Sequence, residues 1–523
     1  MKKLTVLAML AAVLMAGAAF ARTDHRVQPN ATFQFGVGGA AAGPSTTNND
    51  DSCDISTAPA ATLLLPYFEV DFKSPQTTAQ TTLFTVTNVT ALPQIAHVVV
   101  WTDWSFPALD FNIFLTGYDV QAINLYDLFA RGVIAPPSGT TSNTTVPTGN
   151  PAGATPLSNA TDNPNITSLA GCTALPGALP PSIVADLQSV FTTGKSTTGA
   201  ICSTSTAGGG VHANAIGYIT IDVNANCNTS LVVGDANYFT TNILFDNVLI
   251  GDYQQVNPNP ATGNYAGGNP LVHIRAVPEG GSVGSLAAGP STNLPYTFYD
   301  RYTVAGSPAN RHVDRRQPLP AIWAARYIQG GTGAFNTNYK IWREGAFVSA
   351  TCVAGLTANG VIPVTELVRF DEHENASVSS GGIIFSPPPL AFGLPETSSQ
   401  PLSGVVFPSI PTAAGDVAGW TYLNLNSGLM TRTAPAPVVG AARASQNWVI
   451  VSMFAEGRFS VDFDAAWLGN GCSAPVAPSA GGFAADPAAH VIGPAGNVLV
   501  CPLPLTPGAG CAAAPVGTNN TPP

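Results

Sequence analysis

The pattern Gly280-Gly-Ser282-Val-Gly284 fits G-x-S-x-G, in which a serine is the nucleophile of a hydrolase. That chemistry needs a tight turn from a strand into a helix, so that the serine oxygen is exposed. The sequence predicts a strand before the motif, at 271–277, but Pro290 interrupts the segment where the helix would follow. We therefore interpret the motif as a glycine-rich loop and predict no catalytic residue, with an extracellular hydrolase as the alternative.

The densest set of possible metal ligands is Asp371-Glu-His373-Glu374. On a strand, Asp371 and His373 would share one face and the two glutamates the other. The set lacks the histidine pair at i and i+4 that zinc proteases use, and a bound ion would need further ligands from elsewhere. We expect a solvated strand end here and predict neither a metal nor a cofactor.

Basic residues gather in one segment of an otherwise acidic chain. They are Arg301, Arg311, Arg315, Arg316, Arg326, Lys340 and Arg343. Because the planar guanidinium suits carboxylates, these residues would either pin a domain junction to acidic partners or bind an anionic group such as a uronate or a phosphate. The candidate ligand-binding residues of this segment are Arg301, Arg311, Arg315 and Arg316.

Two further candidates for ligand binding are Trp101 and Trp104, which flank Asp103. Exposed at a strand end, their rings could stack on a sugar, and packing in the core is the alternative. A glycan or another cell-surface polymer is therefore one kind of partner that we expect.

The first 21 residues predict export. Lys2 and Lys3 precede an apolar run from Leu4 to Ala16, and Ala19-Phe20-Ala21 has the small-x-small pattern of a cleavage site. This is a signal peptide of bacterial type, so we expect a secreted protein of the periplasm, the cell surface or the medium. After cleavage no other apolar run reaches the length of a membrane-spanning helix.

Composition agrees with export and limits the partners. Charged residues make up 9% of the chain, against about 25% in ordinary globular proteins, and the formal net charge is −11. A surface rich in hydroxyl and amide groups follows, and the negative charge disfavours nucleic acid. The eight cysteines predict disulfides. Spacing favours Cys172 with Cys202 and Cys501 with Cys511.

Short runs of β-branched and aromatic residues recur from residue 51 onward and predict strands. In Gly217–Val223, Ile219, Ile221 and Val223 face one way and the alternate residues the other. The runs are Thr81–Thr87, His97–Asp103, Leu109–Leu115, Tyr118–Leu125 and Gly217–Val223. A helix is predicted from Pro181 to Gly194. This pattern is typical of β-sandwiches.

The chain divides by composition into five segments. They are a signal peptide at 1–21, a flexible leader at 22–50, a first β-sandwich at 51–290 with a loop-rich, partly helical insertion at about 133–212, a second β-sandwich at 291–475, and an Ala/Gly/Pro-rich tail at 476–523. The second sandwich repeats the first. Gly419–Leu425 matches Gly217–Val223, and Val449–Phe459 matches Ile243–Tyr253. Upstream, we align Tyr339–Arg343 with His97–Asp103 and Glu366–Glu374 with Tyr118–Leu125.

The stretch 82–129, with LFTVTN, AHVVVWTD and LDFNIFLTGYDVQAINL, resembles segments of uncharacterised secreted bacterial proteins built from immunoglobulin-like sandwiches. The resemblance implies an all-β chain of two consecutive immunoglobulin-like domains and no catalytic residues. We thus predict a secreted, non-catalytic cell-envelope or extracellular protein that acts in structure or adhesion, with self-association as one outcome. The alternatives are an extracellular hydrolase and a carbohydrate-binding protein.

Overall fold

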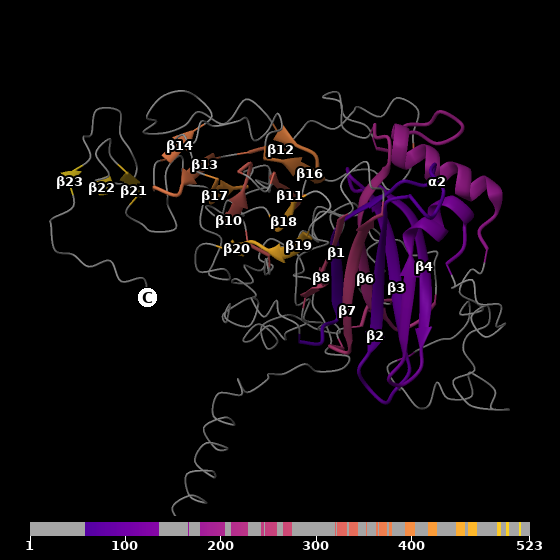
Figure 1. Cartoon of the computed structure of the whole chain (residues 1–523). Helices are drawn as coiled ribbons and strands as arrows, with labels where there is room; N and C mark the ends of the chain where they lie inside the picture. Colours follow the sequence, from indigo (N-terminus) through magenta and orange to yellow (C-terminus); the bar gives the residue numbers. More distant parts are fainter. Residues whose placement is uncertain are drawn as a thin grey trace, which may run out of the picture.

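The computed structural model describes most of residues 58–134 and 178–274, parts of 319–467, and three short strands between 489 and 513. The predicted signal peptide and leader lie outside the described residues. In the described part the chain is mostly β-strand, and every strand pair is antiparallel (Figure 1). No helix in this part is long and apolar enough to cross a membrane.

The first half of the described chain forms two sheets. Its strands are β1 (Thr62–Val70), β2 (Thr81–Asn88), β3 (Gln94–Thr102), β4 (Pro107–Leu115), β5 (Val120–Asn124), β6 (Ala215–Asn224), β7 (Leu249–Asn257), β8 (Tyr265–Pro270) and β9 (Val272–Ile274). One sheet has the order β4-β3-β6-β1-β9 and the other β5-β2-β7-β8. Side chains from both sheets share one apolar core, so the two sheets form a sandwich.

The second half repeats this arrangement. Its strands are β10 (Ile322–Ile328), β11 (Phe335–Arg343), β13 (Glu366–Asp371), β14 (Ala376–Val378), β16 (Thr397–Pro401), β17 (Ala418–Asn424), β18 (Asn447–Ala455), β19 (Phe459–Asp464) and β20 (Ala466–Trp467). The sheet orders are β14-β13-β17-β10-β20 and β16-β11-β18-β19. Each strand therefore has a counterpart at the same place in the first half. A small ribbon of β12 (Ile362–Pro363) and β15 (Gly393–Leu394) is added.

Equivalent residues make equivalent contacts in the two halves. A Cβ on Gly217 would lie 2.0 Å from the carbonyl oxygen of Trp101, and one on Gly419 would lie 2.0 Å from that of Phe370. The next residue stacks on the same neighbour in each half: Tyr218 on Trp101 at 5.7 Å, and Trp420 on Phe370 at 4.3 Å between ring centroids. The repeat predicted from the two glycine-aromatic segments is present in the fold.

Two of the four predicted matches within the repeat are wrong. Tyr339–Arg343 belongs to β11, the counterpart of β2, and Glu366–Asp371 is the counterpart of β3. The strand order also differs from that of an immunoglobulin domain, in which the first strand pairs with the second in one sheet. Here β1 lies between β6 and β9. Side-chain alternation shows which residues form strands, but it does not specify which strands pair. The sequence therefore could not assign the two matches or the strand order.

The helix predicted in the insertion is confirmed as α2 (Pro181–Thr193), which ends at Gly194. A short π-helical turn, η2 (Asp127–Arg131), follows β5. Phe191 of α2 packs on Phe129 of η2, with ring centroids 4.9 Å apart, and on Phe68 of β1. In the predicted tail, β21 (Ala489–Ile492), β22 (Val498–Cys501) and β23 (Ala512–Ala513) form a three-stranded sheet.

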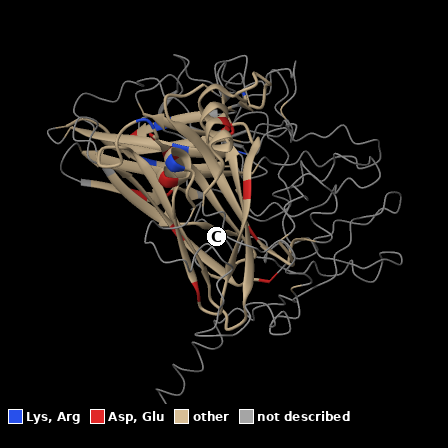
Figure 2. Cartoon of the chain, turned by 90° about the vertical axis from the view of Figure 1, so that its right-hand side faces the viewer, with Lys and Arg blue, Asp and Glu red and all other residues tan. Residues whose placement is uncertain are grey.

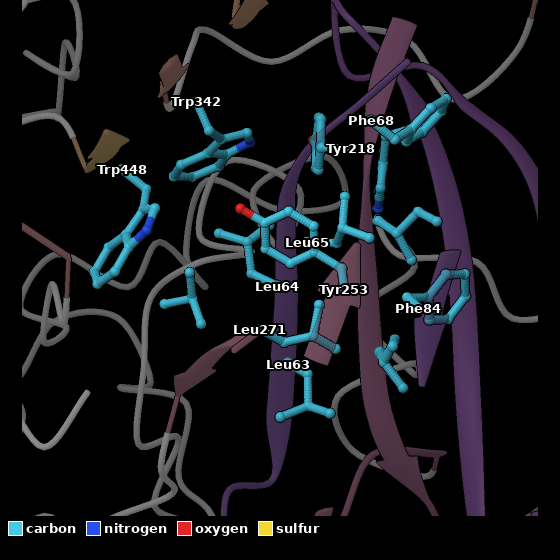
Figure 3. Packing of buried hydrophobic residues seen from close by; sticks show 14 of the residues in the cluster. Leu63, Leu64, Leu65, Phe68, Phe84, Tyr218, Tyr253, Leu271, Trp342 and Trp448 are labelled. Carbon is cyan, nitrogen blue, oxygen red and sulfur yellow. The ribbon is translucent and has the colours of Figure 1, made fainter. Parts of the chain in front are cut away.

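The two halves share a continuous core. Strand β3 is buried along its whole length, and β6 is buried at every residue except Ile216, on both faces of their sheet. Across the junction, Tyr218 of β6 meets Trp342 of β11 edge to face, with centroids 5.8 Å apart. Figure 3 shows Leu63, Leu64 and Leu65 of β1 in the same cluster as Trp342 and Trp448.

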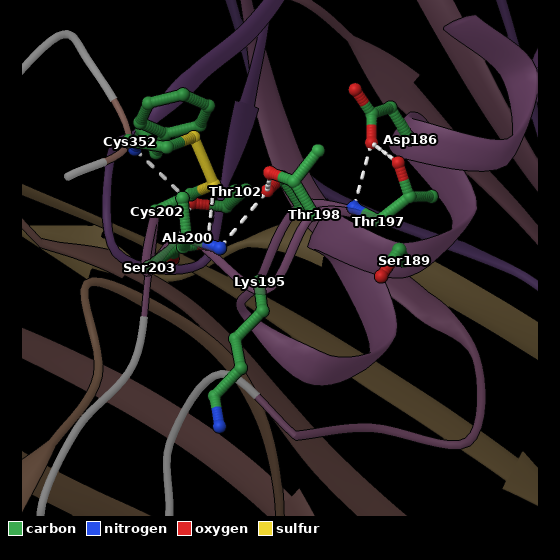
Figure 4. Close-up of a disulfide and its surroundings, with 12 residues drawn as sticks. Thr102, Asp186, Ser189, Lys195, Thr197, Thr198, Ala200, Cys202, Ser203 and Cys352 are labelled. Carbon is green, nitrogen blue, oxygen red and sulfur yellow. Dashed lines mark hydrogen bonds between the residues drawn. A yellow bond between two sulfur atoms is a disulfide. The ribbon is translucent and has the colours of Figure 1, made fainter. Parts of the chain in front are cut away.

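A disulfide also crosses the junction. Cys202, just after α2, is bonded to Cys352 of the second half, 150 residues away in sequence (Figure 4). The predicted Cys172–Cys202 pair is therefore wrong, because the folded chain brings a distant cysteine closer than the spacing suggested. Cys172 and the predicted Cys501–Cys511 pair involve side chains outside the described residues.

We expect the double substitution Cys202→Ser/Cys352→Ser to lower the free energy of unfolding by about 2–5 kcal/mol, because the crosslink restricts the unfolded chain. Urea denaturation of the variant, and of the wild-type protein with and without reductant, measures the effect. Equal denaturation midpoints in all three samples would contradict a stabilising role for this bond.

Candidate functional site

Several polar side chains are hydrogen-bonded around the turn between β3 and β4. We call this group the turn cluster. Its members are Thr102, Asp103, Ser105, Ser203, His212 and Tyr218. The turn lies beside α2 and the disulfide, so three separate chain segments meet there (Figure 4).

The turn cluster contains an aspartate–histidine pair. Nε2 of His212 lies 2.8 Å from Oδ2 of Asp103; the Asp103 side chain is 3% exposed and that of His212 is 20% exposed. The carbonyl oxygen of Asp103 also accepts a hydrogen bond from the backbone N–H of Thr397 in the second half, at 3.2 Å. The pair is thus fixed at the junction, and the histidine is its accessible member.

Two short hydroxyl contacts complete the network. Oγ of Ser105 lies 2.6 Å from the Tyr218 hydroxyl, and Oγ1 of Thr102 lies 2.6 Å from Oγ of Ser203. Ser105 has a φ of 58°, a left-handed conformation that is uncommon outside glycine and is found often at functional sites. The turn thus carries the histidine-bound Asp103 and, two residues further on, Ser105, but Ser105 is fully buried and its hydroxyl bonds to a tyrosine.

Chemically, the pair can hold a proton between a carboxylate and an imidazole, as in a general base. A nucleophilic serine would also need a hydrogen bond to that histidine. The two serine hydroxyls described above instead bond other hydroxyls, Ser105 with Tyr218 and Ser203 with Thr102. The cluster therefore fixes the turn against β6 and the second half.

The prediction that Trp101 and Trp104 present rings to a sugar is wrong. Both side chains are buried, at 0% and 2% exposure, and Nε1 of Trp101 donates a hydrogen bond to Oγ1 of Thr220 at 2.8 Å. Their role is core packing, the alternative stated above. They support the turn cluster from inside.

The basic segment divides between described and undescribed residues. Arg301, Arg311, Arg315 and Arg316, the predicted ligand-binding residues, lie outside the described residues. Of the described members, Arg326 lies over the Phe463 ring, 5.3 Å from its centroid. Lys340 is buried and donates a hydrogen bond from Nζ to Asp462 at 3.1 Å.

Arg343 is fully buried at the end of β11. Its guanidinium donates to the carbonyl oxygens of Ile362, at 2.8 Å, and Leu425, at 2.6 Å, and to Oδ1 of Asn447, at 3.3 Å. Burial lowers the pKa of Arg343 to about 9, and the nearby Glu396 opposes that change. Like Lys340, this residue holds the second half together.

The set of possible metal ligands that begins at Asp371 lies where β13 ends. Oδ1 of Asp371 accepts the backbone N–H of His373, and Oε1 of Glu372 accepts the N–H groups of Val417 and Ala418. Within the described residues, no group of three His, Cys, Asp or Glu side chains is placed to hold a metal. Glu374 and the Gly280–Gly284 motif lie outside the described residues.

Sequence reasoning missed a polar face of the β4-β3-β6-β1 sheet. Asp222 accepts a hydrogen bond from Thr62, and Nδ1 of His97 lies 2.9 Å from Oδ1 of Asn112. Burial raises the pKa of Asp110, and His97, 3.9 Å away, opposes that rise. The alternation in β6 gave this face a polar character, but no signal in the sequence showed that it would be buried.

Breaking the Lys340–Asp462 pair should destabilise the protein. We expect Lys340→Met to cost about 3–5 kcal/mol, because it leaves a buried carboxylate unpaired, and Lys340→Met/Asp462→Leu to regain most of that loss. Denaturant unfolding of both variants tests this. The matched control is Arg131→Met at the Arg131–Asp127 pair, whose arginine side chain is 46% exposed; this substitution should cost under about 1 kcal/mol. A single variant as stable as the double variant would contradict the expectation.

Comparison with known proteins adds no relative to this description. No family model matches the chain, and no curated protein or solved structure matches it. The resemblance to secreted immunoglobulin-like proteins therefore stays a prediction.

Proposed function

We propose that the protein is an exported structural or adhesion protein of the cell envelope or the extracellular space, and that it acts through its surfaces. The observation that carries the proposal is the crosslink between the two halves. A disulfide between Cys202 and Cys352 persists in oxidising compartments outside the cytoplasm, which agrees with the signal pattern at 1–21. A continuous core and a crosslink suit a protein whose fold must resist mechanical force.

The outward face of the β5-β2-β7-β8 sheet supports contact with a polar polymer. It carries partly exposed Thr81, Thr85 and Thr87 on β2, and Oγ1 of Thr85 donates to Asp252 at 2.5 Å. Hydroxyl groups of this kind can hydrogen-bond a glycan or a wall polymer. Charged side chains are sparse along the described strands (Figure 2).

Export is tested by expressing the full chain in a bacterium with a periplasm. We expect a mature protein that begins at Arg22 or within a residue of it, recovered outside the cytoplasm with its cysteines oxidised. Ala21→Asp, which disrupts the cleavage pattern, should accumulate as uncleaved precursor. Recovery of the wild-type protein in the cytoplasm with reduced cysteines would refute the proposal.

The second candidate, an extracellular hydrolase, is favoured by the Asp103–His212 pair beside Ser105. If it were correct, Ser105→Ala and His212→Ala would each abolish turnover of a chromogenic ester. We expect no turnover by the wild-type protein above that of a heat-denatured sample. Turnover that both substitutions remove would replace the structural proposal with the enzymatic one.

A further inference from the structure

Apolar side chains are exposed at the end of the first half that lies away from α2 (Figure 1). Leu92 is 42% exposed, Tyr118 72% and Val120 57%. We call these three residues the tip. They lie on the β2–β3 loop and on the β4–β5 turn with the start of β5, and the backbone N–H of Tyr118 donates to the Thr90 carbonyl oxygen at 2.8 Å.

The tip is a built structure. Asn88 is fully buried beneath it, and its Nδ2 donates to the carbonyl oxygens of Leu92, at 2.7 Å, and Thr116, at 2.9 Å. Tyr118 has a φ of 59°, which is unfavourable for a residue with a bulky side chain. The loops thus hold an aromatic ring in solvent at a conformational cost, which is typical of a functional position.

The repeat shows what the same surface does in the second half. Strand register makes Arg343 the counterpart of Asn88. Arg343 pairs with Asn447, the first residue of β18, and Asn88 pairs with Leu249, the first residue of β7. The N–H of Asn88 donates to the Asp119 carbonyl oxygen, and that of Arg343 donates to the Glu396 carbonyl oxygen.

The residues that follow Asp119 and Glu396, whose carbonyl oxygens accept these bonds, are therefore equivalent as well. Val120 is the counterpart of Thr397, and each begins the edge strand of its sheet. In both halves a buried polar side chain, Asn88 or Arg343, bonds the carbonyl oxygens of the surrounding loops.

In the second half this surface is docked on the first half. Thr397 is fully buried; its N–H donates to the Asp103 carbonyl oxygen and its Oγ1 to that of Pro66, at 3.4 Å. Cys352, from the loop after β11, is the partner of Cys202 in the same contact. The counterpart of an exposed tip residue is thus the centre of an internal interface.

The surface that accepts Thr397 also has a counterpart. The Gly217–Gly419 equivalence makes Glu372 the counterpart of Asp103 and His373 that of Trp104. Whereas Asp103 and Trp104 are buried, Glu372 and His373 are exposed at the end of β13. We call Glu372 and His373 the acceptor end. One molecule therefore exposes both a docking surface and an acceptor surface, at different places.

We propose that the tip of one molecule docks on the acceptor end of a second copy, so that the protein associates head to tail. The inference rests on the proposed structural function and deepens it, because a contact between two different surfaces propagates into a filament. The tip suits such a contact because the carboxylate beside it, on Asp119, already accepts hydrogen bonds from the backbone N–H groups of Thr116 and Val120. No cysteine lies at 88–93 or 116–120, so the contact is reversible and depends on concentration.

Sedimentation velocity over a range of protein concentrations tests the proposal. We expect the wild-type protein to form species that grow with concentration. Tyr118→Asn should weaken association by about tenfold or more, because it removes an aromatic anchor. Asparagine tolerates a positive φ, so this variant should fold normally, and Val120→Asp gives an independent second test. The matched control is Val211→Asn, at a residue that is 64% exposed outside the tip.

A mixing experiment separates head-to-tail docking from pairing of two tips. A Tyr118→Asn molecule keeps its acceptor end, so adding it to wild-type protein should cap the growing chains and shorten them. If the contact joined two tips, the variant would be excluded and the wild-type species would keep their size. That result would overturn the proposal, as would a wild-type monomer at every concentration or assemblies insensitive to both tip substitutions. An exported monomer would leave the proposed function standing while refuting this inference.

Discussion

Burial of both faces of the β4-β3-β6-β1-β9 sheet is the constraint on which the rest of the structure depends. One face packs on the other sheet of the first half, and the second half covers part of the opposite face. There Tyr218 meets Trp342, and Thr397 bonds to Pro66 and Asp103. A polar side chain on a sheet with one solvated face needs no protein partner, but a buried one does.

The hydrogen bonds among polar side chains on that opposite face follow from the constraint. Thr62 bonds to Asp222, Trp101 to Thr220, and His97 to Asn112, each within or across neighbouring strands. At the edge of the same face, Asp103 and His212 satisfy each other's hydrogen-bonding groups. We therefore read these groups as the means by which a polar face is buried, rather than as a reacting centre. Deleting any single partner leaves the other group buried, which makes such networks sensitive to substitution.

The repeat explains why two similar units have different surfaces. Equivalent strand ends carry Asn88 in one half and Arg343 in the other, and each organises the loops above it. The second unit uses this end to dock on the first. The equivalent end of the first unit is exposed in the described residues, with Leu92, Tyr118 and Val120 at its surface. Two repeats of one fold thus differ according to whether another unit covers their equivalent surfaces.

The sequence by itself determined the local structure. The period-2 runs gave strands β2 to β6, Pro181 and Gly194 bounded α2, and the pattern shared by Gly217–Val223 and Gly419–Leu425 disclosed the repeat. These features depend on neighbours a few residues apart, so one chain segment contains all the information.

Only the tertiary structure decided what each face meets. It buried Trp101 and Trp104 and joined Cys202 to Cys352 instead of to Cys172. It also made β11 the counterpart of β2 in the repeat. It also brought His212 to Asp103 across 109 residues. The physical reason is that side-chain periodicity specifies which way a residue points, whereas its burial and its partner are set by whichever distant segment packs against that face.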